Sequence, residues 1–551
     1  AASALGLQYQ KDMDGHRVML RLSKPKKPSM KDPSRWDNSP HKFNKLYAYC
    51  MQDVEAEREI DKTLPDLQGF EHDVWLEDQR INFKGVLIDK KLVNAALKGI
   101  AKYETALNSE MAVQTNGQVV SATQLPKLKT YLQQTYGITV NSLDTAAIET
   151  LLDSPISEEA KGLLRIRQLL GLSSTKKYKR MLSMMDTDNR IRGNQIYHAA
   201  STGRFGGAGV QFQNLPRGSV KNMDMLVDHI KTVDIDVLEF LYPAPMEAFS
   251  SAIRGCVVSP KGYDLIVADY AQIEVRVLFW LANEEYGLEQ FRNGEDLYVN
   301  MAQRIYGNPK LTKADKKERH LGKSTILGCG YSMSAKRFYE TCQSQGIDID
   351  ISLADRAVDT YRTTYTRVVG LWDRLENAAK KAVTTGQTVK CGHVTFGVRG
   401  NFLQCQLPSK RFINYNQPVI QARPLTEEQK TLLAAEGRDW LIDKPQLSCK
   451  GEGLNKQWTD LYLHRGVLVE NCTSAVARDI MVNGMMSLKA YWPEEQYRYS
   501  TILTVHDELV VEVEEDKGSP EEVCKLMCAL PKWAEGLPIE AEAFRCKRYR
   551  K

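Results

Sequence analysis

Residues 265–276 have the sequence LIVADYAQIEVR, in which an apolar run ends at an acidic residue and a helix-like segment follows. The apolar residues before Asp269 predict a buried strand, and the spacing from Ile273 to Leu281 predicts a helix with Glu274 in its first turn. A carboxylate at the end of a buried strand is held rigidly, and hard cations such as Mg²⁺ prefer oxygen ligands. An isolated Asp at such a position is more often a turn or cap residue, so a metal site needs a second element.

The second element is the segment TVHDELVVEV at residues 504–513. Two β-prone runs flank a polar tip at His506, Asp507 and Glu508, which predicts a hairpin with neighbouring carboxylates at its turn. Two such acids repel each other unless a cation joins them. For this tripeptide alone, a hairpin turn with solvated acids is the commoner explanation.

The third element is RHLGKSTILGCGY at residues 319–331. Two cations, a leucine and a tyrosine recur at a spacing of four, which predicts one stripe along a helix. Such a stripe suits a nucleoside triphosphate, because the cations match phosphates and the other two side chains match sugar and base. Three glycines would each weaken the helix by about 1 kcal/mol, so we expect them to let a base or template strand approach the backbone. The simpler alternative is an amphipathic surface helix. The stripe consists of Arg319, Lys323, Leu327 and Tyr331.

Together these segments resemble motifs A, B and C of the family A DNA polymerases, the bacterial DNA polymerase I type, and most closely the phage-encoded members. Each pattern alone is moderately specific for this family. The occurrence of all three in this order is highly specific for it. A fourth segment, Thr202–Phe205 followed by Gln213–Pro216, resembles the part of the family that touches primer-template. The resemblance covers roughly residues 70–551 and is thin between 401 and 457.

The resemblance implies an α+β, right-hand polymerase fold, with an antiparallel sheet in the palm and helical fingers and thumb. The expected parts are a remnant of a 3′–5′ exonuclease domain at 1–68, the thumb with a connecting segment at 69–195, the first part of the palm at 196–283, the fingers at 284–400, and the second part of the palm with an insertion of unclear structure at 401–551.

The resemblance also implies a template-directed DNA polymerase that adds dNTPs to a primer 3′-OH by two-metal-ion phosphoryl transfer, in phage genome replication. Asp269 and Asp507 would hold two Mg²⁺ ions, for which Mn²⁺ could substitute, and the backbone carbonyl of Tyr270 would assist. Glu508 would be a supporting carboxylate. Lys323 would act as a general acid for the pyrophosphate.

The remaining site residues follow from the same resemblance. Arg319 and Lys323 would bind the triphosphate, and Glu274 would exclude a 2′-OH. Arg204 would contact the minor groove, where all correct base pairs present similar acceptors. The expected nucleotide-binding residues are Arg319, Lys323, Leu327, Tyr331, Glu274, Gln272 and His506. The expected DNA-binding residues are Arg204, Gln211, Gln213, Asn214, Lys176, Lys177, Lys179 and Arg180.

Three positions depart from the family pattern. Leu327 stands where many members carry Phe or Tyr, so discrimination against dideoxynucleotides is not carried over. Ser474 stands where Gln is usual, which removes the basis for a primer-template contact. Ala271 replaces the usual Ser.

The N-terminal region contains Tyr49 and Asp53 one helical turn apart, as in the third motif of a proofreading exonuclease. The earlier Asp-x-Glu strand motif is missing, because no apolar strand leads into Asp53-Val54-Glu55. We therefore expect an exonuclease remnant without nuclease activity. An ordinary helix is the alternative.

The bulk composition agrees with a multidomain nucleic-acid enzyme without requiring one. The chain has 551 residues, too many for one core, and a net charge of +5. It has no apolar run of the roughly 18 residues that a membrane span needs. We expect a monomeric, cytoplasmic protein of the host cell with reduced cysteines. Its expected partners are primer-template DNA, dNTPs and replisome accessory proteins.

Three other functions share some of these features. A single-subunit RNA polymerase has a similar palm, but Glu274 and its context argue against it. A catalytically silent DNA-binding protein is disfavoured by the intact acids Asp269 and Asp507. A proofreading nuclease would require the missing strand motif.

Overall fold

The computed structural model describes residues 2–29, 33–171, 173–233, 235–422, 425–435, 442, 444–453, 457–492 and 497–551. The chain forms two compact units, Ala1–Val74 and Trp75–Lys551. The first unit ends a few residues after the boundary predicted at 68. Each unit is described here by itself.

The described part of the first unit is helical and contains no named strand. Helix α3 packs on α2, where Gly15 faces the buried ring of Tyr49. Asp53-Val54-Glu55 lies within α3, so this segment is not a strand. The helices are α1 (Ala2–Leu5), α2 (Met13–Leu22), α3 (Pro40–Thr63) and the beginning of α4 (Gly69–Lys84).

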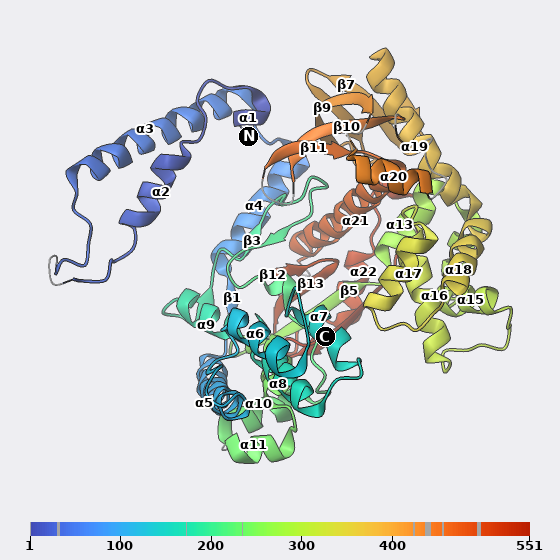
Figure 1. Cartoon of the computed structure of the whole chain (residues 1–551). Coiled ribbons are helices and arrows are strands. Elements are labelled where there is room, and N and C mark those ends of the chain that lie inside the picture. The colour runs from blue at the N-terminus through green and yellow to red at the C-terminus, as the bar shows by residue number, and fades with distance from the viewer. Residues whose placement is uncertain are drawn as a thin grey trace. The chain divides into compact units, whose positions relative to one another are not determined.

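The centre of the second unit is a four-stranded antiparallel sheet with the order β12-β13-β5-β14. Strand β5 is internal, and its apolar residues from Leu265 to Ala268 are buried, as the sequence predicts for this run. The hairpin predicted around His506 is present as β12 and β13. This sheet and the long helix α21 lie together near the middle of Figure 1. The bounds are β5 (Tyr263–Tyr270), β12 (Ser500–Val505), β13 (Glu508–Glu514), β14 (Ala541–Cys546), α21 (Arg465–Ala490) and α22 (Pro520–Met527).

A group of helices follows β5 and lies on the right of Figure 1. The first of them begins at Ile273, as predicted. Helix α16 ends at Cys329, so Tyr331 lies in a turn beyond the helix and the predicted four-residue stripe loses its last member. The helices are α13 (Ile273–Ala282), α14 (Glu285–Arg292), α15 (Leu297–Tyr306), α16 (Lys316–Cys329), α17 (Ala335–Ser344), α18 (Ile351–Thr364) and α19 (Thr366–Thr385).

A second helical group precedes β5. Helix α6 forms although Pro126 favours a turn, because Pro126 occupies the first helical turn, where no backbone N–H is required. Leu128 and Leu132 anchor α6 in the core. The helices and strands are β1 (Val86–Leu87), α5 (Lys90–Gln114), α6 (Leu125–Tyr136), α7 (Thr145–Leu152), α8 (Glu158–Leu170), α9 (Ser173–Met184), β2 (Arg190–Ile191), β3 (Gln195–Ile196), β4 (Gly206–Gly207), η1 (Phe212–Asn214), α10 (Met223–Thr232), α11 (Ile235–Leu241), α12 (Pro245–Ala252) and η2 (Arg254–Cys256).

The region with the weakest sequence pattern forms a six-stranded antiparallel sheet with the order β11-β10-β9-β8-β7-β6. The boundary predicted at residue 400 falls in the turn of the hairpin that pairs β7 with β8. Both sides of that boundary therefore belong to one sheet. The bounds are β6 (Val389–Cys391), β7 (Val394–Arg399), β8 (Phe402–Gln406), β9 (Phe412–Ala422), α20 (Glu427–Ala435), β10 (Pro445–Glu452), β11 (Trp458–Tyr462) and, after the central hairpin, η5 (Lys532–Ala534).

A search of the described residues for a helix long and apolar enough to cross a membrane found none.

Candidate active site

The acids singled out in the sequence meet at one edge of the central sheet. Asp269 lies near the end of β5, and Asp507 lies in the turn between β12 and β13. Glu508 stands directly opposite Asp269 in the antiparallel register. The backbone N–H of Tyr270 donates to the carbonyl of Asp507 at 3.3 Å. Strand pairing therefore brings together acids that are far apart in the sequence.

The site accumulates negative charge in a partly buried environment. Burial, followed by the proximity of Asp269, raises the pKa of Asp507 to about 6. Burial also raises the pKa of Glu508, which is only 1% exposed, although the Tyr549 hydroxyl donates to it at 2.6 Å. Asp269 has one buried carboxylate oxygen, Oδ1, without a hydrogen-bond partner.

An orphaned carboxylate oxygen beside two further acids fits a hard divalent cation, whose preferred ligands are oxygens. Among the described residues, no set of three His, Cys, Asp or Glu side chains is arranged as a complete metal site. The two aspartates would therefore need additional oxygen ligands, such as those of backbone or substrate.

One cation already contacts these acids. Lys551 Nζ lies 3.0 Å from Asp269 Oδ2 and 3.2 Å from Glu508 Oε2. In the sequence this lysine belongs to a basic tail and carries no local signal of an active-site position. It was missed for that reason.

A cavity of about 340 Å³ adjoins Asp269. Arg319 lines it and is held by Asp296, with Nε 3.0 Å and a terminal nitrogen 2.9 Å from Oδ2. The guanidinium also lies over the ring of Tyr298, 5.2 Å from its centre, and Gln272 forms a hydrogen bond with the Tyr298 hydroxyl. The sequence pattern missed Asp296 and Tyr298, because their relation to Arg319 exists only through the packing of α15 on α16.

On α16, Arg319, Lys323 and Leu327 share one solvent-facing side, and Leu327 is 42% exposed. The explanation offered for the glycines was wrong for two of them. A Cβ at Gly322 would overlap the backbone carbonyl oxygen of Tyr298, and one at Gly330 would lie 2.7 Å from a methyl group of Leu278. These glycines allow close packing within the protein, where neither a base nor a template strand is involved.

Glu274 joins three segments beside the acids. It forms an ion pair with Arg204 and accepts a hydrogen bond from the Tyr331 hydroxyl at 3.3 Å. Burial raises the pKa of Tyr331 well above its usual value, so the hydroxyl remains a donor. Glu274 and Tyr331, both expected to bind the nucleotide, are therefore in contact.

The turn that carries Arg204 is held by a buried ionic cluster. Arg411 donates through Nε to Asp479 at 2.8 Å and through a terminal nitrogen to the carbonyl of Thr202 at 2.7 Å. Arg478 Nε donates to the carbonyl of Gly203 at 3.0 Å. Neither arginine was predicted, because they act through backbone groups distant in the sequence.

The predicted DNA-binding residues divide into exposed and buried ones. Gln211 and Asn214 are exposed, and Lys177 Nζ donates to both of their carbonyls, at 3.2 and 3.0 Å. Gln213 is 8% exposed and donates to the carbonyl of Thr504 at 3.0 Å. In this structure Gln213 therefore fastens the turn to β12.

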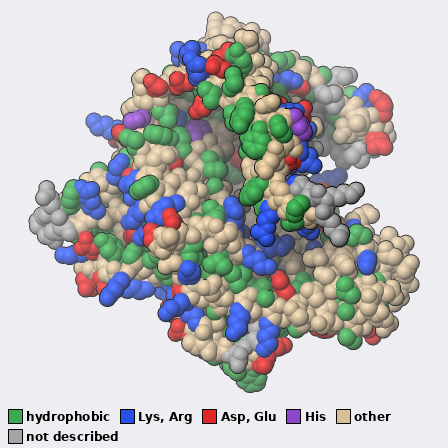
Figure 2. All heavy atoms as spheres, turned by 90° about the vertical axis from the view of Figure 1, so that its left-hand side faces the viewer, with side chains coloured by type: hydrophobic (Ala, Val, Ile, Leu, Met, Phe, Trp, Pro, Cys, Tyr) green, Lys and Arg blue, Asp and Glu red, His purple; other side chains and the backbone are tan. Residues whose placement is uncertain are grey.

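The other predicted contacts lie on the surface. Lys176, Lys179 and Arg180 are exposed on α9, and His506 is exposed at the hairpin turn with a φ of 59°. Figure 2 shows Lys and Arg side chains in several groups on one face of the molecule, with Asp and Glu between them.

The structure also defines the surroundings of Ser474 and of the predicted exonuclease residues Tyr49 and Asp53. Ser474 is buried in α21. In the first unit, a hydrogen bond with Asp53 raises the pKa of Tyr49 to about 12. The two predicted exonuclease residues are therefore neighbours on α3, without a described metal-binding group.

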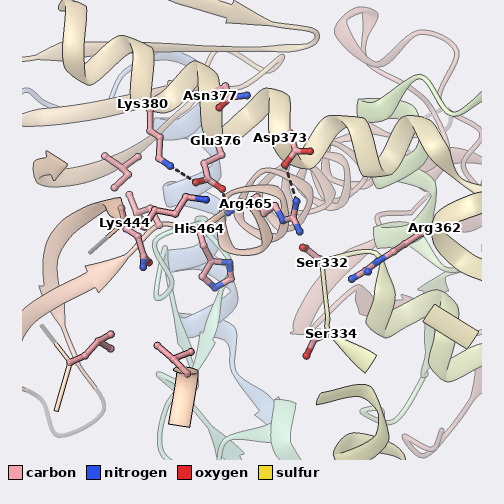
Figure 3. Close-up of a pocket in the computed structure, with 15 residues that line it drawn as sticks. Ser332, Ser334, Arg362, Asp373, Glu376, Asn377, Lys380, Lys444, His464 and Arg465 are labelled. Carbon is pink, nitrogen blue, oxygen red and sulfur yellow. Dashed lines mark hydrogen bonds and ion pairs between the residues drawn. The ribbon is translucent and has the colours of Figure 1, made fainter. Parts of the chain in front are cut away.

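A larger cavity of about 730 Å³ lies away from the acids, between α19, the six-stranded sheet and the start of α21 (Figure 3). Its two carboxylates are already engaged, since Asp373 pairs with Arg465 at 2.9 Å and Glu376 with Lys380 at 2.5 Å. None of the predicted site residues lines it.

Comparisons with known proteins identify the family of the chain. A family model described as DNA polymerase family A matches residues 89–393. The DNA polymerase of Bacillus phage SP02 is 32% identical over 562 residues, which cover 100% of this chain and 82% of that protein. DNA polymerase I of Pseudomonas aeruginosa is 23% identical over 473 residues, covering 84% of this chain and 42% of that protein.

A solved structure shares the fold. It is the POL domain of Pol1 from M. smegmatis in complex with DNA primer-template and dNTP, with a TM-score of 0.56 and 17% identity. The match covers 99% of this chain and 80% of that one. The right-hand polymerase fold predicted from the sequence is thereby confirmed. Family A enzymes use divalent metal ions and synthesise DNA on a template, and this chain belongs to DNA polymerase family A.

Proposed function

We propose that Asp269 and Asp507 bind two Mg²⁺ ions for the addition of dNTPs to a primer 3′-OH, with Mn²⁺ able to replace them. The convergence of these aspartates with Glu508, together with the unpartnered Oδ1 of Asp269, is the observation that carries the proposal. When bound, such ions lower the pKa of the attacking hydroxyl and stabilise the charge of the leaving pyrophosphate. The carbonyl of Tyr270 and the Glu508 carboxylate would support them.

The incoming nucleotide would enter the cavity beside Asp269. Arg319 lines this cavity, and Lys323 follows one turn later on the exposed side of α16. Both cations would bind triphosphate oxygens, and Lys323 would donate a proton to the leaving pyrophosphate. The ion pair of Arg319 with Asp296 would hold the guanidinium in a fixed orientation before the substrate arrives.

Sugar and template selection would depend on the contact between Glu274 and Tyr331. Glu274 would lie against the sugar and exclude a 2′-OH, while Leu327 and Gln272 would contact the same nucleotide. Arg204 would leave Glu274 to reach the minor groove at the primer end, and His506 would contact the primer terminus. These roles are supported by the contacts of Glu274 with Arg204 and Tyr331, which bring three segments of the chain together.

Primer-template DNA would also contact the exposed groups near α9. Lys177 fastens α9 to the turn at Gln211 and Asn214, which gives these exposed polar groups a common orientation. The exposed cations of α9 would bind phosphates without reading sequence. Because the phage relative is similar along the whole chain, we place this activity in the replication of a phage genome.

Primer extension with Mg²⁺ tests the proposal. Asp507→Ala should abolish extension, whereas Asp516→Ala at the other end of β13 should not, because Asp516 is exposed and remote from Asp269. Extension with dNTP, ddNTP and rNTP on one template separates DNA from RNA synthesis. Undiminished extension by Asp507→Ala would contradict the assignment of the acids.

A further inference from the structure

The tail after β14 brings a lysine to the carboxylates of the candidate active site. Lys551 Nζ bridges Asp269 Oδ2 at 3.0 Å and Glu508 Oε2 at 3.2 Å. The lysine side chain is 20% exposed, the Asp269 side chain 36% and the Glu508 side chain 1%. The contact is thus neither a fully solvated surface pair nor a fully buried one.

The position of Lys551 follows from a tightly held tail. Tyr549 is fully buried, its N–H donates to the carbonyl of Val257 at 2.9 Å, and its hydroxyl donates to Glu508 Oε1 at 2.6 Å. Arg548 is anchored to Asp89 at 3.0 Å. Only Arg550 lies between the anchored Tyr549 and Lys551, so the Cα of Lys551 is at most about 7 Å from that of Tyr549. The ammonium group is therefore confined to the neighbourhood of the acids.

Apart from the Tyr549 hydroxyl at Glu508, Lys551 is the group among the described residues that offsets the charge of Asp269 and Glu508 by direct contact. The buried Oδ1 of Asp269 has no hydrogen-bond partner. Arg204, which also lies near Asp507, is engaged in an ion pair with Glu274. Lys551 therefore supplies positive charge where a divalent ion would bind.

We propose that the Lys551 ammonium group is a built-in counter-cation of the Asp269–Glu508 pair, which a divalent ion must displace when it binds the DNA-free enzyme. The inference rests on the proposed function of the acids and adds a residue that limits their metal affinity. Because the ammonium and the ion compete for the same carboxylate oxygens, removing the ammonium strengthens metal binding. For an ion pair of this exposure the change corresponds to about a five- to twentyfold gain in affinity.

The same tail offers a matched control. Lys547 bridges Asp264 and Glu515, with Nζ 2.6 Å from Asp264 Oδ1. This second lysine pair lies at the opposite end of β5 from Asp269. Its removal takes away the same charge from the same tail without touching the candidate metal site.

Mn²⁺ binding to the DNA-free chain of 551 residues tests the proposal, with the free-ion electron paramagnetic resonance signal as the readout. Lys551→Met should bind Mn²⁺ about five- to twentyfold more tightly than the wild type, and Lys551→Arg should stay within about twofold of it. Lys547→Met should match the wild type. Asp507→Asn should weaken Mn²⁺ binding, which would show that the measured ion binds at the candidate active site.

Equal or weaker Mn²⁺ binding by Lys551→Met would overturn the inference, and so would an equal gain in Lys547→Met. Lys551→Gln, which keeps a polar side chain of similar length, repeats the measurement if Lys551→Met does not fold. Primer extension by the wild type with Mg²⁺ tests the proposed function independently. Normal extension by the wild type combined with unchanged Mn²⁺ affinity in Lys551→Met and Lys551→Gln would overturn this inference alone.

Discussion

Replacing Asp507 with Asn should stabilise the metal-free protein while removing its activity. The pKa of Asp507 rises from 3.8 to about 6, because the carboxylate is buried and lies near Asp269. The folded protein therefore binds a proton at this site more readily than the unfolded chain. Between about pH 4 and pH 6 the folded state loses stability as pH rises, because ionisation is harder in the folded protein.

The magnitude follows from the size of the shift. A rise of about two pKa units lowers the free energy of unfolding by roughly 3 kcal/mol above pH 6. Asp269 shares the repulsion, so only part of this free energy belongs to Asp507. We therefore expect Asp507→Asn to raise the free energy of unfolding by about 1–3 kcal/mol at a pH where the Asp507 side chain is ionised. Asn resembles the neutral acid in shape and removes the charge.

Unfolding should be followed in EDTA at pH 8 and pH 4.5, by thermal or urea denaturation. Asp507→Asn should raise the transition temperature at pH 8, by up to a few degrees for a unit of this size, and much less at pH 4.5. Asp516→Asn, an exposed aspartate in a turn, is the control. A gain that is equal at both pH values, or a loss of stability at pH 8, would refute the reasoning.

Three further predictions concern residues around the site. Arg411→Met should lower the free energy of unfolding by about 3–5 kcal/mol, because it removes the ion pair of Arg411 with the buried Asp479 carboxylate. Urea unfolding measures this change, and unchanged stability would contradict the prediction. Gly322→Ala should cost about 1–3 kcal/mol by overpacking α16 against α15, whereas Gly328→Ala, whose Cβ would make only ordinary contacts, should be neutral or stabilising in the same assay. Glu274→Ala should raise the kcat/KM for rNTP relative to dNTP by about tenfold or more, measured in single-nucleotide extension, and an unchanged ratio would exclude a sugar-selecting role.

The local sequence was sufficient wherever neighbouring residues specify the structure. The continuous apolar run before Asp269 predicts a buried strand, and the longer segment from Ile273 predicts a helix. Both elements are almost wholly buried in the structure. The runs on either side of His506 likewise predict the hairpin of β12 and β13. The order of these motifs also predicted the family and the right-hand fold.

Local patterns failed where the partner of a residue is distant in the chain. Pro126 by itself favours a turn, although the core around Leu132 supports a helix there. The glycines of α16 were assigned to substrate approach, although Gly322 faces the backbone of Tyr298. The six-stranded sheet gave no clear pattern, because its strands are defined by pairing with one another.

The sequence by itself therefore determined the elements that carry Asp269, Asp507 and Arg319, since the signals for them lie within a few turns or strand residues. Only the tertiary structure decided what surrounds these side chains. Lys551 at the acids and Asp296 beside Arg319 are ionic contacts, and attraction between charges depends on distance in space rather than along the chain. Such contacts leave no periodic trace in the sequence, so they become visible only when the strands and helices have packed.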